Sequence, residues 1–376
     1  MDKSIKREYK RIVVKVGTSL ITSRDDYLDE NFIKTLVSQI SDLQLAGYQM
    51  IFVSSGAVAA GRTAMKGIVN DAGELDRQVL AAVGQGRLIN VYEKSFEAHS
   101  IITAQALLSK RDVNDRLGYL NIRNTLLALL AHGVVPIINE NDVVSVDELT
   151  GEVFGDNDNL SALVASMIDA DLLIILGRID GMYDKDPNIY SDAELIQTVF
   201  ELDSNIDKLA GPSIDFMGRG GMVTKIEAAK LAIASGIDVI IANGTFESVI
   251  TKLINGDKIG TLFKSSGSHV ESRKRWMLSR SINEVKIIVD DGAVKALLKN
   301  KSSLLPAGLI DIEGKFKRGD VVSIVDINNN VIGMGISNYD SLDIDKITGV
   351  QSNKIKNVLG YHFGDEVIHR NNMILL

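Results

Sequence analysis

The stretch Arg11-Ile-Val-Val-Lys-Val-Gly-Thr-Ser-Leu20 is a run of mostly β-branched residues that one lysine interrupts just before a glycine. Val13, Val14 and Val16 favour a buried strand, and Gly17 allows a sharp turn with free N–H groups at the strand's carboxyl end. The pattern therefore predicts a strand with the ammonium group of Lys15 at its mouth, where an anion can bind. A buried lysine that extends to the surface explains the same pattern, so this stretch alone leaves both interpretations open.

Composition limits the class of protein. The chain has 376 residues, of which 45% are hydrophobic and 24% charged, and this suits a globular protein with two domains. The net charge of -8 argues against non-specific nucleic-acid binding by the whole surface. Cysteine is absent, which excludes disulfides, thiolate metal sites and cysteine nucleophiles.

The chain shows no targeting or membrane signal. The apolar run near the N-terminus is short and is interrupted by Lys15, so it makes a poor signal peptide. Runs such as Leu172-Leu-Ile-Ile-Leu176 are far shorter than the roughly 18 residues that span a bilayer. We therefore expect a cytoplasmic protein without membrane contact.

Helical and strand patterns alternate along the first two thirds of the chain. After the first strand, the predicted strands are 49–53, 134–138, 171–176 and 238–242, and the predicted helices cover about 32–46, 75–96, 117–130, 159–168 and 222–234. Near-continuous apolar strands that alternate with helices predict an α/β fold, in which helices sandwich a mostly parallel sheet.

Polar residues follow the predicted strands. In open parallel sheets, ligands bind beyond the carboxyl ends of the strands. These ends carry, in chain order, Lys15-Val-Gly-Thr, Ser54-Ser-Gly, Asn139-Glu-Asn-Asp, Gly177-Arg and Asn243-Gly. Polar loops are common after strands, but so many ends suited to one anionic or amino-acid ligand predict a small-molecule site at this edge.

A change in composition marks a second domain. Residues 265–275 are small and polar and indicate a linker after a catalytic domain of residues 1–264. Residues 276–376 contain short β runs at 285–289, 321–325 and 331–336, separated by turns. They predict a small, mainly β domain.

The loop Gly218-Arg-Gly-Gly-Met-Val-Thr-Lys225 leads into a helix that should begin near Met222. Free N–H groups at a helix start, with a lysine in the first turn, can bind phosphate groups. The sequence does not match G-x-x-x-x-G-K-[ST], which excludes a P-loop NTPase at this site. A plain glycine-rich connection explains the loop equally well.

Two clusters combine carboxylates and amides. Asp156, Asn157, Asp158 and Asn159 precede a predicted helix, and one of them is expected to cap it. The others can hold an amino group, orient lysines or bind Mg²⁺ through water. The cluster Asn139-Glu-Asn-Asp142 suits the α-amino and α-carboxyl groups of an amino acid, or is simply a polar turn.

Taken together, these motifs resemble the amino acid kinase family with a C-terminal PUA domain, over nearly the whole chain. The matching stretches are Val14-Lys-Val-Gly-Thr-Ser19, Ser54-Ser-Gly-Ala-Val-Ala-Ala-Gly61, Ala81-Ala-Val-Gly-Gln85, Asn139-Glu-Asn-Asp142, Gly155-Asp-Asn-Asp-Asn-Leu-Ser-Ala162, Gly181-Met-Tyr183 with Asp186-Pro187, Gly220-Gly-Met-Val-Thr-Lys225, and Ser302-Ser-Leu-Leu-Pro-Ala-Gly308.

The resemblance implies phosphorylation of the side-chain carboxylate of L-glutamate by ATP with Mg²⁺, giving glutamyl 5-phosphate, the first step of proline biosynthesis. It implies that Lys15 and Lys225 contact the transferring phosphoryl group and that Asp158 orients them. By the same resemblance, the residues that hold glutamate are Ser55, Asp142 and Asn157. The implied nucleotide-binding residues are Lys15, Gly177, Arg178, Arg219, Gly220, Gly221, Met222, Val223, Thr224 and Lys225, and no protein metal ligand is implied.

Two positions depart from the family pattern. Gly177-Arg178 replaces the usual Ser/Thr-Asp, and Arg219 replaces a small residue in the glycine-rich loop. We hypothesise that Arg178 and Arg219 contact the nucleotide phosphates or stack on the base, and so alter nucleotide affinity or choice. Two solvated arginines are the alternative.

Other functions stay open at this point. The PUA resemblance implies an RNA-binding type of fold, but from Trp276 onward 12 Lys+Arg balance 12 Asp+Glu, so RNA binding is expected to be weak. A role of this domain in assembly or regulation is the stronger expectation. A sister kinase with another acid substrate is a further alternative. The family resemblance also implies a homo-oligomer and feedback inhibition by proline.

Overall fold

A computed structural model describes residues 9–23, 27–66, 74–144, 157–187, 189–200, 206, 221–265, 285–300 and 302–375. The chain divides into two compact units, residues 1–114 with 122–268 and residues 115–121 with 269–376. The predicted domain limits, 1–264, 265–275 and 276–376, remain predictions, because residues 266–284 lie outside the described part of the chain.

The first unit is built on an eight-stranded sheet with the order β3-β4-β2-β1-β5-β7-β8-β6. The strands are β1 Arg11–Val16, β2 Gln49–Ser54, β3 Thr103–Leu108, β4 Val135–Glu140, β5 Leu172–Gly177, β6 Thr198–Val199, β7 Asp238–Asn243 and β8 Thr261–Phe263. All neighbours from β3 to β7 pair in parallel, whereas β8 runs antiparallel to β7. The prediction of a mostly parallel sheet is confirmed, and the predicted polar strand ends meet at one edge.

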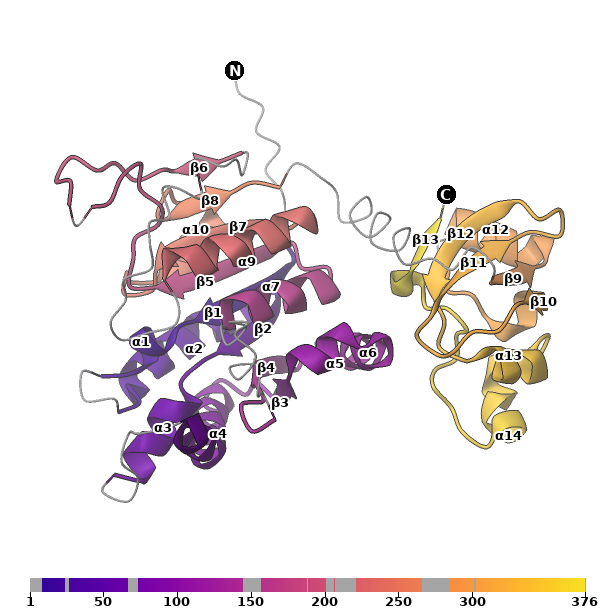
Figure 1. Ribbon diagram of the computed structural model, residues 1–376, viewed down its shortest axis with the longest axis horizontal. Coiled ribbons are helices and arrows are strands. Elements are labelled where there is room, and N and C mark those ends of the chain that lie inside the picture. Colours follow the sequence, from indigo (N-terminus) through magenta and orange to yellow (C-terminus); the bar gives the residue numbers. More distant parts are fainter. Residues whose placement is uncertain are drawn as a thin grey trace. The chain divides into compact units, whose positions relative to one another are not determined.

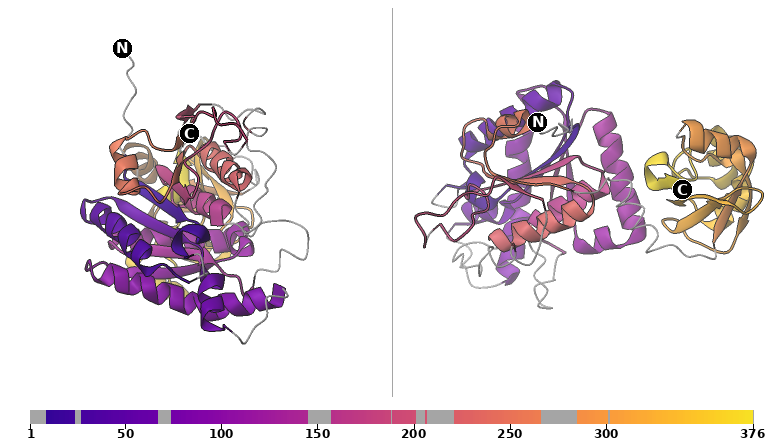
Figure 2. Two further views of the ribbon diagram at one scale, coloured as in Figure 1. Left: turned by 90° about the vertical axis from the view of Figure 1, so that its left-hand side faces the viewer. Right: turned by 90° about the horizontal axis from the view of Figure 1, so that it is seen from above.

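Helices cover both faces of this sheet (Figure 1 and Figure 2). They are α1 Thr18–Ile21, α2 Glu30–Leu45, α3 Ala57–Ala64, α4 Glu74–Glu97, α5 Lys110–Asn114, α6 Arg116–Ala131, α7 Asn157–Met167, α9 Met222–Ala234 and α10 Val249–Asn255. None of the described helices combines the length and the apolar character needed to cross a membrane.

Successive side chains of β1 face opposite sides of the sheet, and this alternation sets the direction of Lys15. Val14 packs in a core with residues of α2 and α4, whereas Val13 packs on the opposite face with residues of α7 and α9. Side chains two residues apart in a strand share a face. Lys15 therefore projects towards α7 and α9.

The elements that the sequence did not predict are mostly short. They include α3, α5, α10, β6 and β8, none of which is longer than eight residues. Strand β3 was also not predicted, and of its six residues only Leu108 is buried, so it lacks the apolar run of the other strands. The helix predicted from residue 159 begins at Asn157 instead, which puts Asp158 inside its first turn. The residue before this helix, the natural position for the predicted cap, lies outside the described residues.

Two glycines allow α3 and α4 to touch backbone to backbone. A Cβ atom added to Gly84 would lie 1.8 Å from the carbonyl oxygen of Ala57, and one added to Gly61 would lie 1.8 Å from that of Leu80. No real side chain fits at such a distance. Gly61 and Gly84 are therefore explained by helix packing, which fixes α4 beside the carboxyl end of β2.

The second unit contains a five-stranded sheet with the order β10-β9-β11-β12-β13. Its strands are β9 Lys286–Val289, β10 Leu309–Glu313, β11 Val321–Val325, β12 Val331–Ile336 and β13 Met373–Leu375, and its helices are α12 Asp291–Asn300, α13 Ser341–Ile347 and α14 Ile355–Leu359. The three strands predicted here are present, and the three helices were not predicted.

Candidate active site

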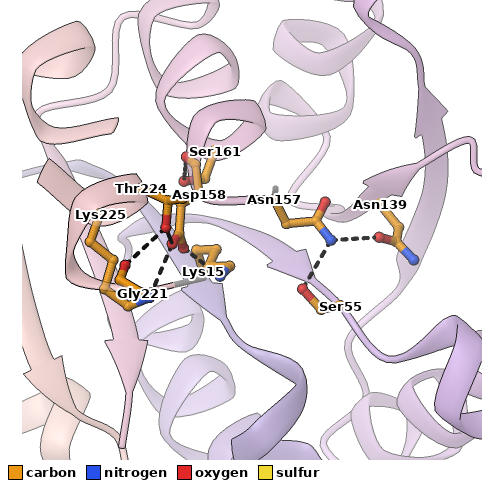
Figure 3. A network of polar contacts seen from close by, with 9 residues as sticks. All are labelled: Lys15, Ser55, Asn139, Asn157, Asp158, Ser161, Gly221, Thr224 and Lys225. Carbon is orange, nitrogen blue, oxygen red and sulfur yellow. Dashed lines mark hydrogen bonds and ion pairs between the residues drawn. The ribbon is translucent and has the colours of Figure 1, made fainter. Parts of the chain in front are cut away.

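A buried carboxylate joins two lysines at the edge of the first sheet (Figure 3). Lys15 forms an ion pair with Oδ1 of Asp158, and the ammonium nitrogen of Lys225 lies 3.1 Å from Oδ2 of the same carboxylate. Lys15 is 3% exposed, Lys225 is 5% exposed and Asp158 is fully buried. The three residues predicted to be catalytic therefore form one cluster.

Three elements supply this cluster. Lys15 comes from β1, Asp158 from the first turn of α7 and Lys225 from the first turn of α9. Thr224 adds a second contact between the two helices, because its hydroxyl oxygen lies 3.1 Å from Oδ2 of Asp158 and 3.0 Å from the carbonyl oxygen of Gly221. The start of α9 at Met222, with Gly221 before it, matches the prediction.

The two lysines keep Asp158 ionised despite its burial. Burial by itself would raise the pKa of Asp158, but the ammonium groups of Lys15 and Lys225 outweigh this effect and hold that pKa below its usual value. Asp158 is therefore ionised at neutral pH and holds both ammonium groups in place at this edge of the sheet. Two ammonium groups at the carboxyl ends of the strands suit the binding of an anion.

A chain of amide hydrogen bonds lies beside the cluster (Figure 3). The Nδ2 group of Asn157 donates to Oγ of Ser55 at 2.9 Å and to Oδ1 of Asn139 at 3.0 Å. The Nδ2 group of Asn139 donates in turn to Oε1 of Gln85 at 2.8 Å. Two of the residues predicted to hold glutamate, Ser55 and Asn157, are thus in direct contact.

Asp142, the third of these residues, lies in the turn after β4. No hydrogen bond joins its carboxylate to Ser55 or Asn157 within the described contacts. Burial raises the pKa of Asp142 above its usual value, and the positive charge of Arg77 partly opposes this effect.

The end of β5 lies next to Lys225. A Cβ atom added to Gly177 would come within 3.2 Å of Cε of Lys225, so glycine leaves room for the lysine stem. Arg178 is exposed, and its Nε–H group donates to the carbonyl oxygen of Ser19 at 2.7 Å. Arg178 thus joins the loop after β5 to helix α1. Arg219 and Gly220 lie outside the described residues.

Two contacts in the site were not predicted from the sequence. The sequence motif containing Gln85 was recognised, but its contact with Asn139 depends on how α4 packs on the sheet. Thr224 was predicted to contact the nucleotide, and its contact with Asp158 was not predicted. Among the described residues, no group of three or more His, Asp or Glu side chains is placed to hold a metal ion.

Comparisons with known proteins identify the family of this chain. The model of the amino acid kinase family matches residues 10–243, and the model of the PUA domain matches residues 285–359. The chain belongs to the amino acid kinase family.

The chain is also similar over its whole length to individual relatives. Glutamate 5-kinase of Dehalococcoides mccartyi is 50% identical over 98% of this chain and 99% of its own length. Glutamate 5-kinase of Thermoanaerobacter pseudethanolicus is 45% identical over 97% of this chain and 98% of its own. Among solved structures, UMP kinase from Bacillus anthracis covers 69% of this chain and 98% of that chain at 13% identity, with a TM-score of 0.48, too low to support a functional inference.

Proposed function

We propose that this protein transfers a phosphoryl group from ATP to the side-chain carboxylate of L-glutamate, giving L-glutamyl 5-phosphate, the first step of proline biosynthesis. The observation that carries the proposal is the pair of lysines held on the buried carboxylate of Asp158 at the mouth of the sheet. Similarity over almost the full chain to proteins named glutamate 5-kinase supports the same substrate.

The chemistry of this transfer suits the charges in the cluster. An oxygen of the glutamate carboxylate forms a bond to the terminal phosphorus of ATP, while the bond from that phosphorus to ADP breaks and ADP leaves. The attacking carboxylate is already ionised at neutral pH, so no catalytic base is needed. The main obstacle is repulsion between two anions, which Lys15 and Lys225 reduce.

Packing does not explain the glycine next to Lys15. A Cβ atom added to Gly17 would lie 3.8 Å from both Nζ of Lys15 and the carbonyl oxygen of Leu176, which are ordinary contact distances. Glycine is therefore not required here by packing. We propose that the absence of a side chain at this point lets an anion approach the ammonium group of Lys15 and the backbone N–H groups after Gly17.

The hydrogen-bonded side chains of Ser55, Asn139 and Asn157 offer both an acceptor and a donor to an amino acid. Oδ1 of Asn157 is buried and has no hydrogen-bond partner among the described residues, so it can accept from the α-ammonium group. Ser55 accepts from Asn157 and retains its own hydroxyl hydrogen for a substrate carboxylate. Asp142 supplies a second acceptor for the ammonium group.

ATP and Mg²⁺ complete the proposal. Gly177, Arg178 and the start of α9 would bind the nucleotide, together with Arg219 and Gly220. Mg²⁺ usually keeps several waters and is held by substrate phosphates with one or two carboxylates, so it would enter with the nucleotide and add positive charge at the transferring group.

The remaining parts of the proposal concern regulation and partners. We propose proline as a feedback inhibitor because it resembles part of the substrate, and we propose a cytoplasmic homo-oligomer. Weak RNA binding by the PUA domain remains less favoured, because the second part of the chain has no excess of basic residues.

The test is transfer from ATP·Mg²⁺ to L-glutamate, with hydroxylamine to trap the acyl phosphate as a hydroxamate. L-Aspartate and N-acetylglutamate serve as competing acids. Hydroxamate from glutamate alone is the expected result. Hydroxamate from another acid alone would favour a sister kinase, and none from any acid would contradict the proposal.

A further inference from the structure

The orientation of the two asparagine amides is fixed by a backbone group. The N–H group of Glu140 can only donate, and it contacts the side chain of Asn139 at 2.9 Å, so the atom that it reaches must be Oδ1. The Nδ2 group of Asn139 then points the other way, towards Gln85.

The orientation of the Asn157 amide is fixed in the same way. Oδ1 of Asn139 accepts, so the atom of Asn157 that faces it must be Nδ2. This orientation leaves Oδ1 of Asn157 as a buried acceptor that no described residue satisfies. The polarity of the proposed ammonium site is therefore set by contacts that the substrate never makes.

Gln85 is the anchor at the far end of this chain. Asn139 is 3% exposed, and Oε1 of Gln85, 2.8 Å away, is the acceptor for its Nδ2 group. If Gln85 is lost, a buried donor has no acceptor, and the amide of Asn139 must rotate or tilt to find one. Any such movement also disturbs the bond to Asn157.

Helix α4 is a suitable base for such an anchor. Gly84, the residue before Gln85, holds α4 against the backbone of α3. Seven residues after Gln85, the hydroxyl of Tyr92 lies 2.8 Å from Oγ of Ser54, the neighbour of Ser55. The same helix thus contacts the ends of both β2 and β4.

We infer that Gln85 is a positioning residue for recognition of the substrate amino group: it holds the Asn139 amide so that Asn157 presents Oδ1 to the substrate. This inference rests on the proposed phosphorylation of glutamate. It assigns to Gln85 an effect on glutamate affinity, with little effect on nucleotide affinity or on the transfer step.

The test compares Gln85→Leu and Gln85→Met, which remove the acceptor, with Gln85→Glu, which keeps it. Asn90→Leu is the matched control, because Asn90 is an exposed amide on the same helix. The readouts are KM for glutamate, KM for ATP and kcat in the hydroxamate assay. Wild-type activity is measured first, so that failure of the proposed function is recognised separately.

Both apolar variants should raise KM for glutamate about tenfold or more, while KM for ATP and kcat change less than about threefold. Gln85→Glu and Asn90→Leu should stay within about threefold of the wild type. The inference is overturned if the apolar variants leave KM for glutamate unchanged. It is also overturned if KM for ATP rises in parallel, or if Gln85→Glu loses as much glutamate affinity as the apolar variants, because either result indicates a general structural role.

Discussion

Lys225 contacts Asp158 across the gap between helices α9 and α7, with 3.1 Å between Nζ and Oδ2. This pairing keeps a second buried ammonium group next to Lys15 without requiring a ligand to hold it in place. A cation positioned in advance stabilises charge that develops during phosphoryl transfer, and the loss of one such group typically costs about 100-fold to 1000-fold in rate.

Lys225→Met should therefore lower kcat by about 100-fold or more, with a much smaller change in KM for glutamate. Lys252→Met, at an exposed position of α10, is the control. The measurement is hydroxamate formation at saturating ATP and glutamate. A decrease in kcat of less than about tenfold would contradict a direct role of Lys225 in transfer.

Asp238 connects β7 to the end of the first unit. Its carboxylate accepts from Lys264 at 2.6 Å, from the hydroxyl of Ser265 at 2.9 Å and from the hydroxyl of Tyr9 at 3.0 Å. Although burial acts to raise the pKa of Asp238, the hydrogen bonds from Lys264 and Ser265 lower it overall. Asp238→Asn should therefore reduce the free energy of unfolding by about 2 kcal/mol at neutral pH.

This effect depends on pH in a defined direction. Because the pKa is lower in the folded state than in the unfolded state, the ionised carboxylate stabilises the fold above the unfolded value of about 4. That contribution is lost as the pH falls through the folded pKa, so the difference between wild type and Asp238→Asn should shrink in acid. Urea unfolding followed by circular dichroism measures it, with the exposed Asp257→Asn as control. A difference that stays constant with pH would argue against this account.

The contact between α3 and α4 predicts opposite effects for two neighbouring glycines. Gly84→Ala should destabilise the protein by about 3 kcal/mol or more, because the added carbon overlaps the Ala57 carbonyl oxygen. Gly86→Ala should stabilise it by up to about 1 kcal/mol, because the space around Gly86 is open and alanine favours a helix. Thermal unfolding of the two variants checks the prediction, and similar melting temperatures would show that the helices can separate easily.

Ser41 is fully buried in α2, and its hydroxyl has no partner among the described residues. Ser41→Ala should therefore leave the free energy of unfolding unchanged or raise it by about 1 kcal/mol. Ser95 is the matched control, because it is also a buried helical serine but donates to the carbonyl oxygen of Val91 at 2.7 Å. Chemical denaturation should show a lower free energy of unfolding for Ser95→Ala and no decrease for Ser41→Ala.

Arg178 provides a test of nucleotide choice. Its Nε–H group binds the carbonyl oxygen of Ser19, and its two terminal nitrogens have no partner among the described residues. If those nitrogens contact phosphate, Arg178→Ala should raise KM for ATP about tenfold, and Arg178→Lys should recover part of the loss. The measurement compares the KM values for ATP, GTP and CTP between the wild type, the Arg178 variants and Arg219→Ala. Unchanged values would leave Arg178 with only a structural role.

The sequence by itself determined the elements whose pattern is local. Apolar strands such as β5, and helices with a regular apolar face such as α2, were predicted because each residue's burial follows from the period of its own segment. The parallel arrangement followed as well, since helices alternate with strands. Lys15 could therefore be assigned to the ligand edge of the sheet.

Only the tertiary structure decided which distant groups meet. The residue pattern placed Asp158 near the start of a helix, and only the family resemblance paired it with Lys15 and Lys225. The physical reason for that pairing is tertiary, because α7 and α9 share one face of β1. The contact between Gln85 and Asn139 likewise depends on how closely α4 approaches α3. Such contacts join residues far apart in the chain, and they depend on packing distances and hydrogen-bond polarity that no local pattern encodes.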